Sequence, residues 1–232
     1  EFMKKNKSLD TLEIDSHIKL CILDPLERVN QKRPSKPQDI VLYGFGRIGR
    51  LVSRIMAQMT GPGNYYRLKA IVVRKGSDTK DLLKRASLLR RDSVHGTFHG
   101  TIRVDNETET LVINGNPVKI IYAAGPKDFK YSDYGIDNPI VIDNTGVWRE
   151  EEDLSLHLES GASKVVLTAP GKGQIKNIVN GINNDILDES DKIISAASCT
   201  TNAIVHLLHI INKENTINSA HIETVKAYKN YK

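Results

Sequence analysis

The pattern of hydrophobic and polar positions over residues 40–73 predicts a βαβ unit. Residues 40–43 form a short apolar run typical of a buried strand, and residues 44–46 form a glycine turn. Residues 47–59 carry apolar residues at helical spacing and end where Thr-Gly-Pro-Gly follows. Residues 67–73 form a second buried strand, so strand, helix and strand follow each other within a short stretch.

Further short, β-branched runs bounded by Gly, Asn or Pro predict more strands. They lie at residues 101–104, 111–113, 118–122, 139–142, 164–167 and 192–196, and a last strand is expected at 221–227. Helices are expected at residues 153–160 and 200–212. Because a helix between successive strands favours a parallel sheet, the predicted fold class is α/β with a Rossmann-type, doubly wound parallel sheet.

Composition and charge add one candidate surface. The chain is 39% hydrophobic and 26% charged, which is ordinary for a globular protein. Its net charge of +5 is densest at residues 84–91, where four cations surround apolar residues. This cluster could bind phosphate or nucleic acid, but we favour a solvated helix face because no aromatic residues are interleaved for base stacking.

Cysteine spacing and hydropathy argue against two classes of site. Cys21 and Cys199 lie far apart, and neither belongs to a metal-binding spacing. The longest apolar runs are far shorter than the roughly 20 residues of a membrane-spanning helix. The basic start of the chain is not followed by the apolar region of a signal peptide, so we expect a cytoplasmic protein without a metal or a membrane segment.

The glycine turn is a candidate phosphate-binding site. Gly44, Gly46 and Gly49 form the pattern G-x-G-x-x-G. The first glycine permits the turn, the second lets the backbone approach a pyrophosphate, and the third allows close packing of helix and strand. The helix N-terminus supplies free N–H groups. An ordinary glycine turn is the alternative, but the flanking strands and helix favour a dinucleotide cofactor.

The end of the second predicted strand leaves the choice of cofactor open. An NAD site usually carries Asp or Glu there to bind the ribose hydroxyls. This chain has Arg74 and Lys75 instead, and both could contact a 2′-phosphate or could simply be exposed. Asp78 could still reach the ribose from the following loop. We therefore expect NAD or NADP.

Cys199 is a candidate nucleophile. It lies in the sequence ASCTTN between a predicted strand and a predicted helix, at the positive end of the helix dipole. This position favours the thiolate, which is the nucleophilic form. A lone cysteine is more often inert core, but the hydroxyl-rich neighbours argue against an apolar environment. Cys21 has no such neighbours, and we interpret it as structural.

Five motifs in order resemble those of the phosphorylating glyceraldehyde-3-phosphate dehydrogenase family. They are GFGRIGR (44–50), RRDSVHGTFHG (90–100), DNTGVW (143–148), VVLTAPGKG (165–173) and ASCTTNAIVHLL (197–208). The resemblance extends from about residue 39 to residue 228. The chain is similar to a bacterial subgroup of this family that has an N-terminal extension. Residues 3–38 look like a remnant of that extension.

The resemblance implies an NAD(P)-dependent oxidoreductase of glycolysis and gluconeogenesis. Cys199 would form a thioester on the way from glyceraldehyde 3-phosphate and phosphate to 1,3-bisphosphoglycerate, with its backbone N–H stabilising the oxyanion. Ser198, Thr200 and Thr201 would hold substrate or phosphate. The glycine turn, the strand end and the resemblance together give these cofactor-binding candidates: Gly44, Gly46, Arg47, Ile48, Gly49, Arg74, Thr145, Gly146 and Thr168.

The sequence departs from the family at two points. Lys226 occupies the position of the family's catalytic histidine, and an unperturbed lysine with a pKa near 10.4 is a poor general base at neutral pH. The sequence ends at Lys232, so most of the catalytic domain and of the tetramer interface is expected to be absent. Structural or surface roles are expected for the histidines that could replace the base: His95, His99, His206, His209 and His221.

These interpretations divide the chain into three parts. Residues 1–38 are an N-terminal extension and linker, residues 39–198 are an NAD(P)-binding Rossmann domain, and residues 199–232 begin an incomplete α+β catalytic domain. Two functions stay open: an active glyceraldehyde-3-phosphate dehydrogenase, or an inactive remnant of the family that binds dinucleotide or a protein partner. A nucleic-acid-binding module is a third hypothesis that rests only on charge.

Overall fold

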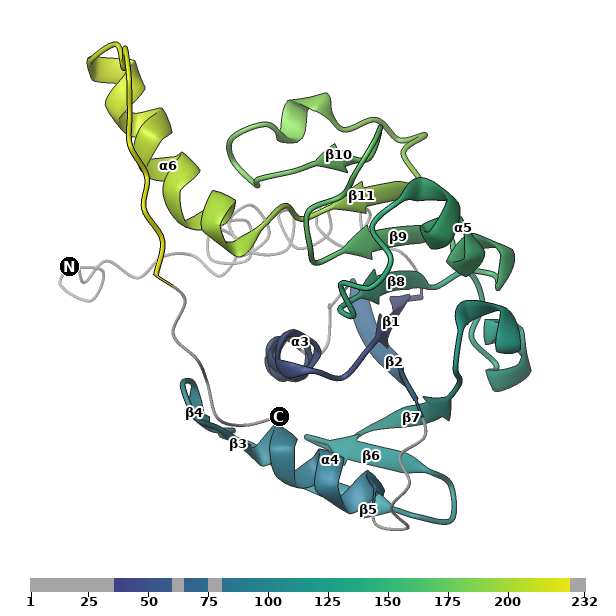
Figure 1. Cartoon of the computed structure of the whole chain (residues 1–232). Coiled ribbons are helices and arrows are strands. Elements are labelled where there is room, and N and C mark those ends of the chain that lie inside the picture. Colours follow the sequence, from purple (N-terminus) through teal and green to yellow (C-terminus); the bar gives the residue numbers. More distant parts are fainter. Residues whose placement is uncertain (1–35, 60–64, 75–80, 226–232) are drawn as a thin grey trace, which may run out of the picture. The chain divides into compact units, whose positions relative to one another are not determined.

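A nine-stranded sheet organises the chain from Gln38 onward (Figure 1). The computed structural model describes residues 36–59, 65–74 and 81–225. The strand order is β10-β11-β9-β8-β1-β2-β7-β6-β5. The strands are β1 (Gln38–Tyr43), β2 (Tyr66–Val73), β5 (Ile102–Asp105), β6 (Thr110–Ile113), β7 (Asn116–Tyr122), β8 (Ile140–Asp143), β9 (Lys164–Leu167), β10 (Lys176–Asn177) and β11 (Ile193–Ser195).

Four α-helices and a small hairpin complete the described elements. They are α3 (Arg47–Gln58), α4 (Asp81–Arg90), α5 (Glu151–Glu159) and α6 (Cys199–Glu214), with the hairpin β3 (Arg91–Asp92) and β4 (Gly96–Thr97) and the short 3₁₀ helices η2 (Pro126–Asp128), η3 (Tyr131–Tyr134) and η4 (Asn184–Ile186). The predicted α/β fold class is confirmed, because the central strands are parallel and helices connect several of them.

The sheet is parallel except at one edge. The strands β5, β6 and β7 pair antiparallel, an edge that the predicted parallel sheet did not include. The turn between β6 and β7 explains this difference. Asn114 and Gly115 both have positive φ angles, of 48° and 82°, as a two-residue hairpin turn requires. So short a connection joins only antiparallel neighbours.

Alternate residues of β1 face two separate apolar cores. Ile40 and Leu42 pack in a core with residues of α3 and α4. Val41 and Tyr43 pack in a second core with Ala162, which follows α5. Successive side chains of a strand point to opposite faces, so this alternation means that helices cover both faces of the central sheet (Figure 1).

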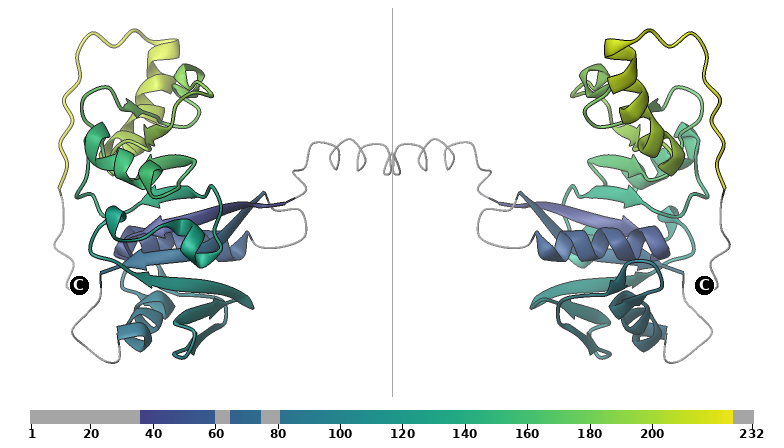
Figure 2. Two further views of the ribbon diagram at one scale, coloured as in Figure 1. Left: turned by 90° about the vertical axis from the view of Figure 1, so that its right-hand side faces the viewer. Right: turned by 90° about the vertical axis from the view of Figure 1, so that its left-hand side faces the viewer.

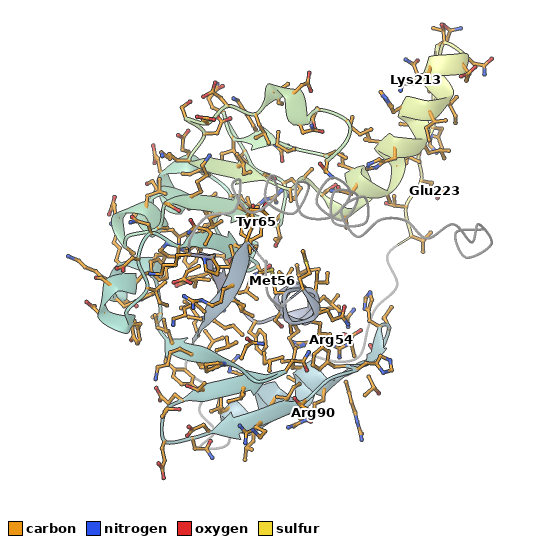
Figure 3. All side chains as sticks on the ribbon, turned by 180° about the vertical axis from the view of Figure 1, so that it is seen from behind. Arg54, Met56, Tyr65, Arg90, Lys213 and Glu223 are labelled. Atoms are coloured by element: carbon orange, nitrogen blue, oxygen red, sulfur yellow. The ribbon has the colours of Figure 1, made fainter. Side chains whose placement is uncertain are left out.

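An arginine on α3 joins this helix to the region that follows β2. Arg54 donates from Nε and Nη2 to the carbonyl oxygen of Leu89, at 2.9 and 2.7 Å, and from Nη1 to that of Gly96 at 3.1 Å. Its guanidinium carbon lies 5.9 Å from the ring centre of Phe98. Arg54 extends from α3 toward this region in Figure 3. It therefore holds α4 and the β3–β4 hairpin against α3.

The last predicted strand is wrong within the described residues. Residues 221–225 belong to no strand, and residues 226–227 lie outside the described part of the chain. The described residues that follow α6, 215–225, do not join the sheet (Figure 2). An isolated β-branched segment has no neighbour for its backbone hydrogen bonds, and Val225 is 92% exposed.

Candidate functional site

A cavity of about 390 Å³ opens at the carboxyl ends of the central strands. The chain leaves β1 toward α3 on one face and leaves β8 toward α5 on the other, so the crevice between β1 and β8 is a topological switch point. Ligands of open α/β sheets bind at such points. The lining residues are Tyr43, Gly44, Phe45, Gly46, Val72, Val73, Arg74, Arg85, Ala123, Ala124, Asn144, Thr145, Val147 and Trp148.

The three glycines of the turn differ in what the fold requires of them. Gly44 has a φ of +92°, and a Cβ there would lie 2.9 Å from Cγ2 of Thr145. A Cβ on Gly49 would lie 2.3 Å from the carbonyl oxygen of Gly44, so the close packing expected of this glycine is present. Gly46 has a φ of −70°, and a Cβ there would meet nothing within 4 Å. The open space beside Gly46 therefore fits a ligand that approaches its backbone closely.

The N-terminus of α3 offers hydrogen-bond donors beside this space. The N–H of Arg50 makes the first helical bond, to Gly46 O at 3.0 Å, and no side chain caps the helix. The N–H groups of residues 47–49 thus precede the helical ladder and suit an anion such as a pyrophosphate. The side chain of Arg47 is not part of the cavity lining, and its Nε lies 3.8 Å from Asp92 Oδ2.

A buried carboxylate fixes the loop that follows β8. Oδ1 of Asp143 accepts hydrogen bonds from the backbone N–H and the hydroxyl of Thr145, both at 2.7 Å. Oδ2 of Asp143 lies 3.1 Å from Nε2 of His157 on α5. Both side chains of this pair are completely buried. Thr145 lines the cavity, so Asp143 and His157 position part of its wall.

Aromatic side chains surround this pair. The ring centres of Tyr43 and His157 lie 4.7 Å apart, and those of Tyr43 and Trp148 lie 5.4 Å apart, in edge-to-face arrangements. Burial raises the pKa of the Tyr43 hydroxyl above its ordinary range, the charges of Asp143 and Asp128 add to this rise, and Arg74 opposes it. Tyr43 therefore stays a neutral phenol.

Two arginines lie at the end of the cavity formed by β2 and α4. Arg74 follows the last residue of β2 and is exposed. Arg85 donates from Nη2 to the carbonyl oxygen of Arg74 at 3.0 Å and from Nε to Asp81 Oδ2 at 2.6 Å. Arg85 belongs to the basic cluster at residues 84–91 that we interpreted as a solvated helix face. Its position four residues after Asp81 on a helix is the sequence signal that predicts this ion pair.

The segment around Cys199 is held by side-chain hydrogen bonds. Cys199 is the first residue of α6, and Ser198 caps the helix by accepting a hydrogen bond from Thr201 N at 2.9 Å. Nδ2 of Asn202 donates to the carbonyl oxygens of Ala196, at 2.8 Å, and Ser198, at 2.9 Å. The strand end, the cap and the first turn of α6 thus form one hydrogen-bonded unit.

The backbone before the cysteine is strained. Ala197 has a φ of 58°, a left-handed conformation that residues with a Cβ rarely adopt. Such strain persists where the surroundings impose it, and it is frequent at functional sites. The N–H of Ala197 donates to the hydroxyl of Ser195 at 3.0 Å, and Ser195 is completely buried.

A second cavity, of about 350 Å³, adjoins this segment. Its lining includes Ser198 and Thr201 but neither Cys199 nor Thr200. The thiol of Cys199 is exposed and free of any disulfide. Of the three residues predicted to hold substrate or phosphate, Ser198 and Thr201 therefore line this cavity and Thr200 does not.

The predicted cofactor residues are also divided between the cavity lining and its surroundings. The lining includes Gly44, Gly46, Arg74 and Thr145. Thr168 lies outside the lining, and its hydroxyl donates to the carbonyl oxygen of Asp143 at 3.0 Å. The other predicted residues outside the lining are Arg47, Ile48, Gly49 and Gly146.

Several residues of this site were not predicted from the sequence. Tyr43, Trp148 and Arg85 line the cavity, and His157 supports it from behind. The aromatic residues gave no periodic signal, and the histidine meets its carboxylate only through the packing of α5 on β8. Lys226, which the sequence predicts at the position of the family's histidine, lies outside the described residues.

The described part of the chain contains neither a metal-ligand cluster nor a membrane-spanning helix. No cluster of three or more potential metal-ligating side chains occurs there. Among the described helices, none is both long enough and apolar enough to cross a bilayer.

Comparison with known proteins identifies the domain that carries this cavity. The family profile described as "Glyceraldehyde 3-phosphate dehydrogenase, NAD binding domain" matches residues 38–151. The chain belongs to the glyceraldehyde-3-phosphate dehydrogenase family. The expected cofactor class, NAD or NADP, agrees with this match, and the family is one of oxidoreductases.

Relatives from bacteria cover the same region. A "Glyceraldehyde-3-phosphate dehydrogenase-like protein" of Pseudomonas aeruginosa is 58% identical over 193 residues, which are 83% of this chain and 42% of that protein. The "Glyceraldehyde-3-phosphate dehydrogenase" of Thermotoga maritima is 38% identical over 191 residues, which are 82% of this chain and 54% of that protein. The chain thus spans about half the length of the relatives that it matches.

Proposed function

We propose that this chain binds a nicotinamide dinucleotide across the cavity and carries the nucleophile that oxidises the aldehyde of glyceraldehyde 3-phosphate. The open space beside Gly46, at the uncapped N-terminus of α3, is the observation that carries the proposal. A pyrophosphate is the ligand that such a turn accommodates best, because phosphate oxygens need close N–H donors and no intervening Cβ. Thr145, Tyr43 and Trp148 supply a wall for the nicotinamide half.

Cys199 is proposed as the nucleophile of the reaction. Its thiolate adds to the aldehyde carbon, a C–S bond forms, and the carbonyl electron pair moves to oxygen. The backbone N–H groups at the start of α6 stabilise this oxyanion. When bound, the nicotinamide supplies the hydride acceptor that turns this adduct into a thioester.

Inorganic phosphate completes the proposed cycle. A phosphate oxygen adds to the thioester carbon, the C–S bond breaks, and the thiolate of Cys199 is restored as 1,3-bisphosphoglycerate leaves. Ser198 and Thr201, which face the second cavity, are proposed to hold this phosphate or that of the substrate. Thr200 lies outside that lining, so we propose that it contributes less to phosphate binding than Ser198 and Thr201.

A second candidate function is dinucleotide binding without turnover. It is favoured by the position of Cys199, which lines neither cavity, and by α6, which has no buried residue. A nucleophile that is not held against the cofactor forms few productive complexes.

One assay separates the two candidates. The purified chain is incubated with glyceraldehyde 3-phosphate, phosphate and either NAD or NADP, and the absorbance of the reduced cofactor is followed. The first candidate predicts reduction that depends on phosphate and is lost in Cys199→Ser. Dinucleotide binding by calorimetry without any reduction would establish the second. A Gly46→Val variant that binds dinucleotide as well as the wild type would contradict both.

A further inference from the structure

The described lining of the cavity beyond β2 and β7 carries positive charge and no carboxylate. Its charged lining residues are Arg74 and Arg85. No Asp or Glu is among the lining residues in the described part of the chain. A site for an unphosphorylated ribose normally places a carboxylate here to accept the 2′- and 3′-hydroxyl hydrogens.

We infer that this cavity selects a dinucleotide with a phosphate ester on the adenosine 2′-oxygen, NADP(H) rather than NAD(H), and that Arg74 is the selecting residue. The inference rests on the proposed dinucleotide site and specifies its ligand.

The position of Arg74 relative to the glycine turn supports this assignment. The N–H of Gly44 donates to the carbonyl oxygen of Val72 at 2.9 Å, so the turn is tied to the end of β2. Arg74 follows Val72 by two residues, just after the end of β2, the strand next to β1. With the pyrophosphate at the turn, the adenosine ribose of an extended dinucleotide lies beside the end of the second strand.

Arg74 is the available cation of the two. Arg85 pairs with Asp81 and is further engaged by the carbonyl oxygen of Arg74. Arg74 is exposed, and it forms no ion pair with any described residue. A guanidinium with free N–H groups binds a phosphate dianion through paired, charge-assisted hydrogen bonds.

Two described carboxylates that bond to residues of the cavity lining, Asp81 and Asp128, are already engaged. Asp81 accepts the hydrogen bond from Arg85 Nε. Oδ2 of Asp128 accepts from the backbone N–H of Ala124 at 2.9 Å and of Gly125 at 2.7 Å. Neither of these two carboxylates lines the cavity, so among the described residues a 2′-phosphate beside Arg74 faces no lining carboxylate.

Binding of paired ligands to the full chain tests the inference. Calorimetry compares NADPH with NADH, and 2′,5′-ADP with 5′-AMP, so that the second pair probes the adenosine half alone. We expect each 2′-phosphorylated ligand to bind at least about tenfold more tightly than its counterpart. Arg74→Ala should remove most of this preference and leave NADH affinity within about threefold, and Arg74→Asp should reverse the preference. Arg103→Ala removes an exposed arginine of β5 outside the cavity lining and should change neither affinity.

The outcomes separate the inference from the function on which it rests. NADH binding as tight as NADPH, or an equal loss of both in Arg74→Ala, would overturn the inference and leave dinucleotide binding intact. A preference for 2′,5′-ADP that depends on Arg74, without binding of either dinucleotide, would support the phosphate site and contradict the nicotinamide half of the proposed function. Binding of none of the four ligands would overturn both.

Discussion

Nε2 of His157 lies 3.1 Å from Oδ2 of Asp143, and both side chains are completely buried. The other oxygen of Asp143 accepts two hydrogen bonds from Thr145. A carboxylate inside a protein needs such partners, because burial without them costs several kcal/mol. This pair therefore links the stability of the sheet to the shape of the proposed cofactor cavity.

Replacing this histidine should destabilise the fold strongly. His157→Ala leaves Asp143 without its partner on α5 and opens a cavity, so we expect a loss of about 3 kcal/mol in the free energy of unfolding. His209→Ala is a matched control, since His209 is exposed on α6, and it should change stability by less than about 0.5 kcal/mol. Denaturant unfolding measures both. Equal, small effects of the two variants would show that the buried pair contributes little.

Replacing two glycines of the turn by alanine should affect the stability of the fold to different extents. In Gly49→Ala the new Cβ would lie 2.3 Å from the carbonyl oxygen of Gly44, so we expect a loss of about 2 kcal/mol in stability from the forced shift. In Gly46→Ala the methyl group enters open space, so stability should change by less than about 1 kcal/mol.

The same pair should differ in ligand binding. Gly46→Ala should weaken dinucleotide affinity by about tenfold or more, because the methyl group occupies the space proposed for the pyrophosphate. Calorimetry with the preferred dinucleotide measures this loss, and thermal unfolding without ligand checks that the variant folds. Wild-type affinity in Gly46→Ala would place the pyrophosphate elsewhere.

Acid should weaken the β3–β4 region through Asp92. The N–H of His95 holds the pKa of the Asp92 carboxyl well below its ordinary value, the N–H of Val94 adds to this effect, and burial opposes it. A carboxyl with a lowered folded pKa contributes stability that is complete above its unfolded pKa of about 3.9 and is lost as the pH falls below that value. Asp92→Asn should therefore be less stable near neutral pH and less sensitive to acid below about pH 4.

Unfolding experiments from about pH 6 to pH 2 test this prediction. The difference in unfolding free energy between wild type and Asp92→Asn should shrink as the pH falls, because the contribution of the ionised carboxyl disappears. A difference that stays constant over this range would contradict a lowered pKa of Asp92 in the folded state.

Loss of the α6 cap should affect both stability and the thiol. Ser198→Ala removes the acceptor of the Thr201 N–H and should cost about 1 kcal/mol, whereas Ser198→Thr keeps the hydroxyl and should cost less. Alkylation of Cys199 at mildly acidic pH should slow in Ser198→Ala, because a frayed helix end stabilises the thiolate less. Faster alkylation in that variant would show that access, and not helix geometry, limits the thiol.

The apolar residues of α6 should promote self-association. Ile210 is 62% exposed and Leu207 is 53% exposed, with Ile211 beside them. Exposed apolar surface of this kind is typical of an interface. Sedimentation should show concentration-dependent oligomers that Ile210→Lys reduces, without loss of stability in the monomer. A monodisperse wild-type monomer would contradict this expectation.

The sequence specified much of this fold because the deciding forces are local. The apolar runs at 40–43 and 67–73 are strands, and the helix between them begins at Arg47, as the glycine turn indicates. The predicted strand at 221–227 was wrong over its described part, because a strand also needs a neighbour that the composition of the segment does not supply.

The sequence by itself determined the βαβ unit, the glycine turn and the position of Cys199 at the start of a helix, since turn chemistry and apolar period act within a few residues. Only the tertiary structure brought His157 to Asp143 and Arg85 to the backbone of Arg74. It also distinguished Gly46, where a side chain would meet nothing, from Gly44 and Gly49, which the packing requires to be glycine. These relationships depend on which helix covers which face of the sheet, and that choice is made by the burial of the whole core.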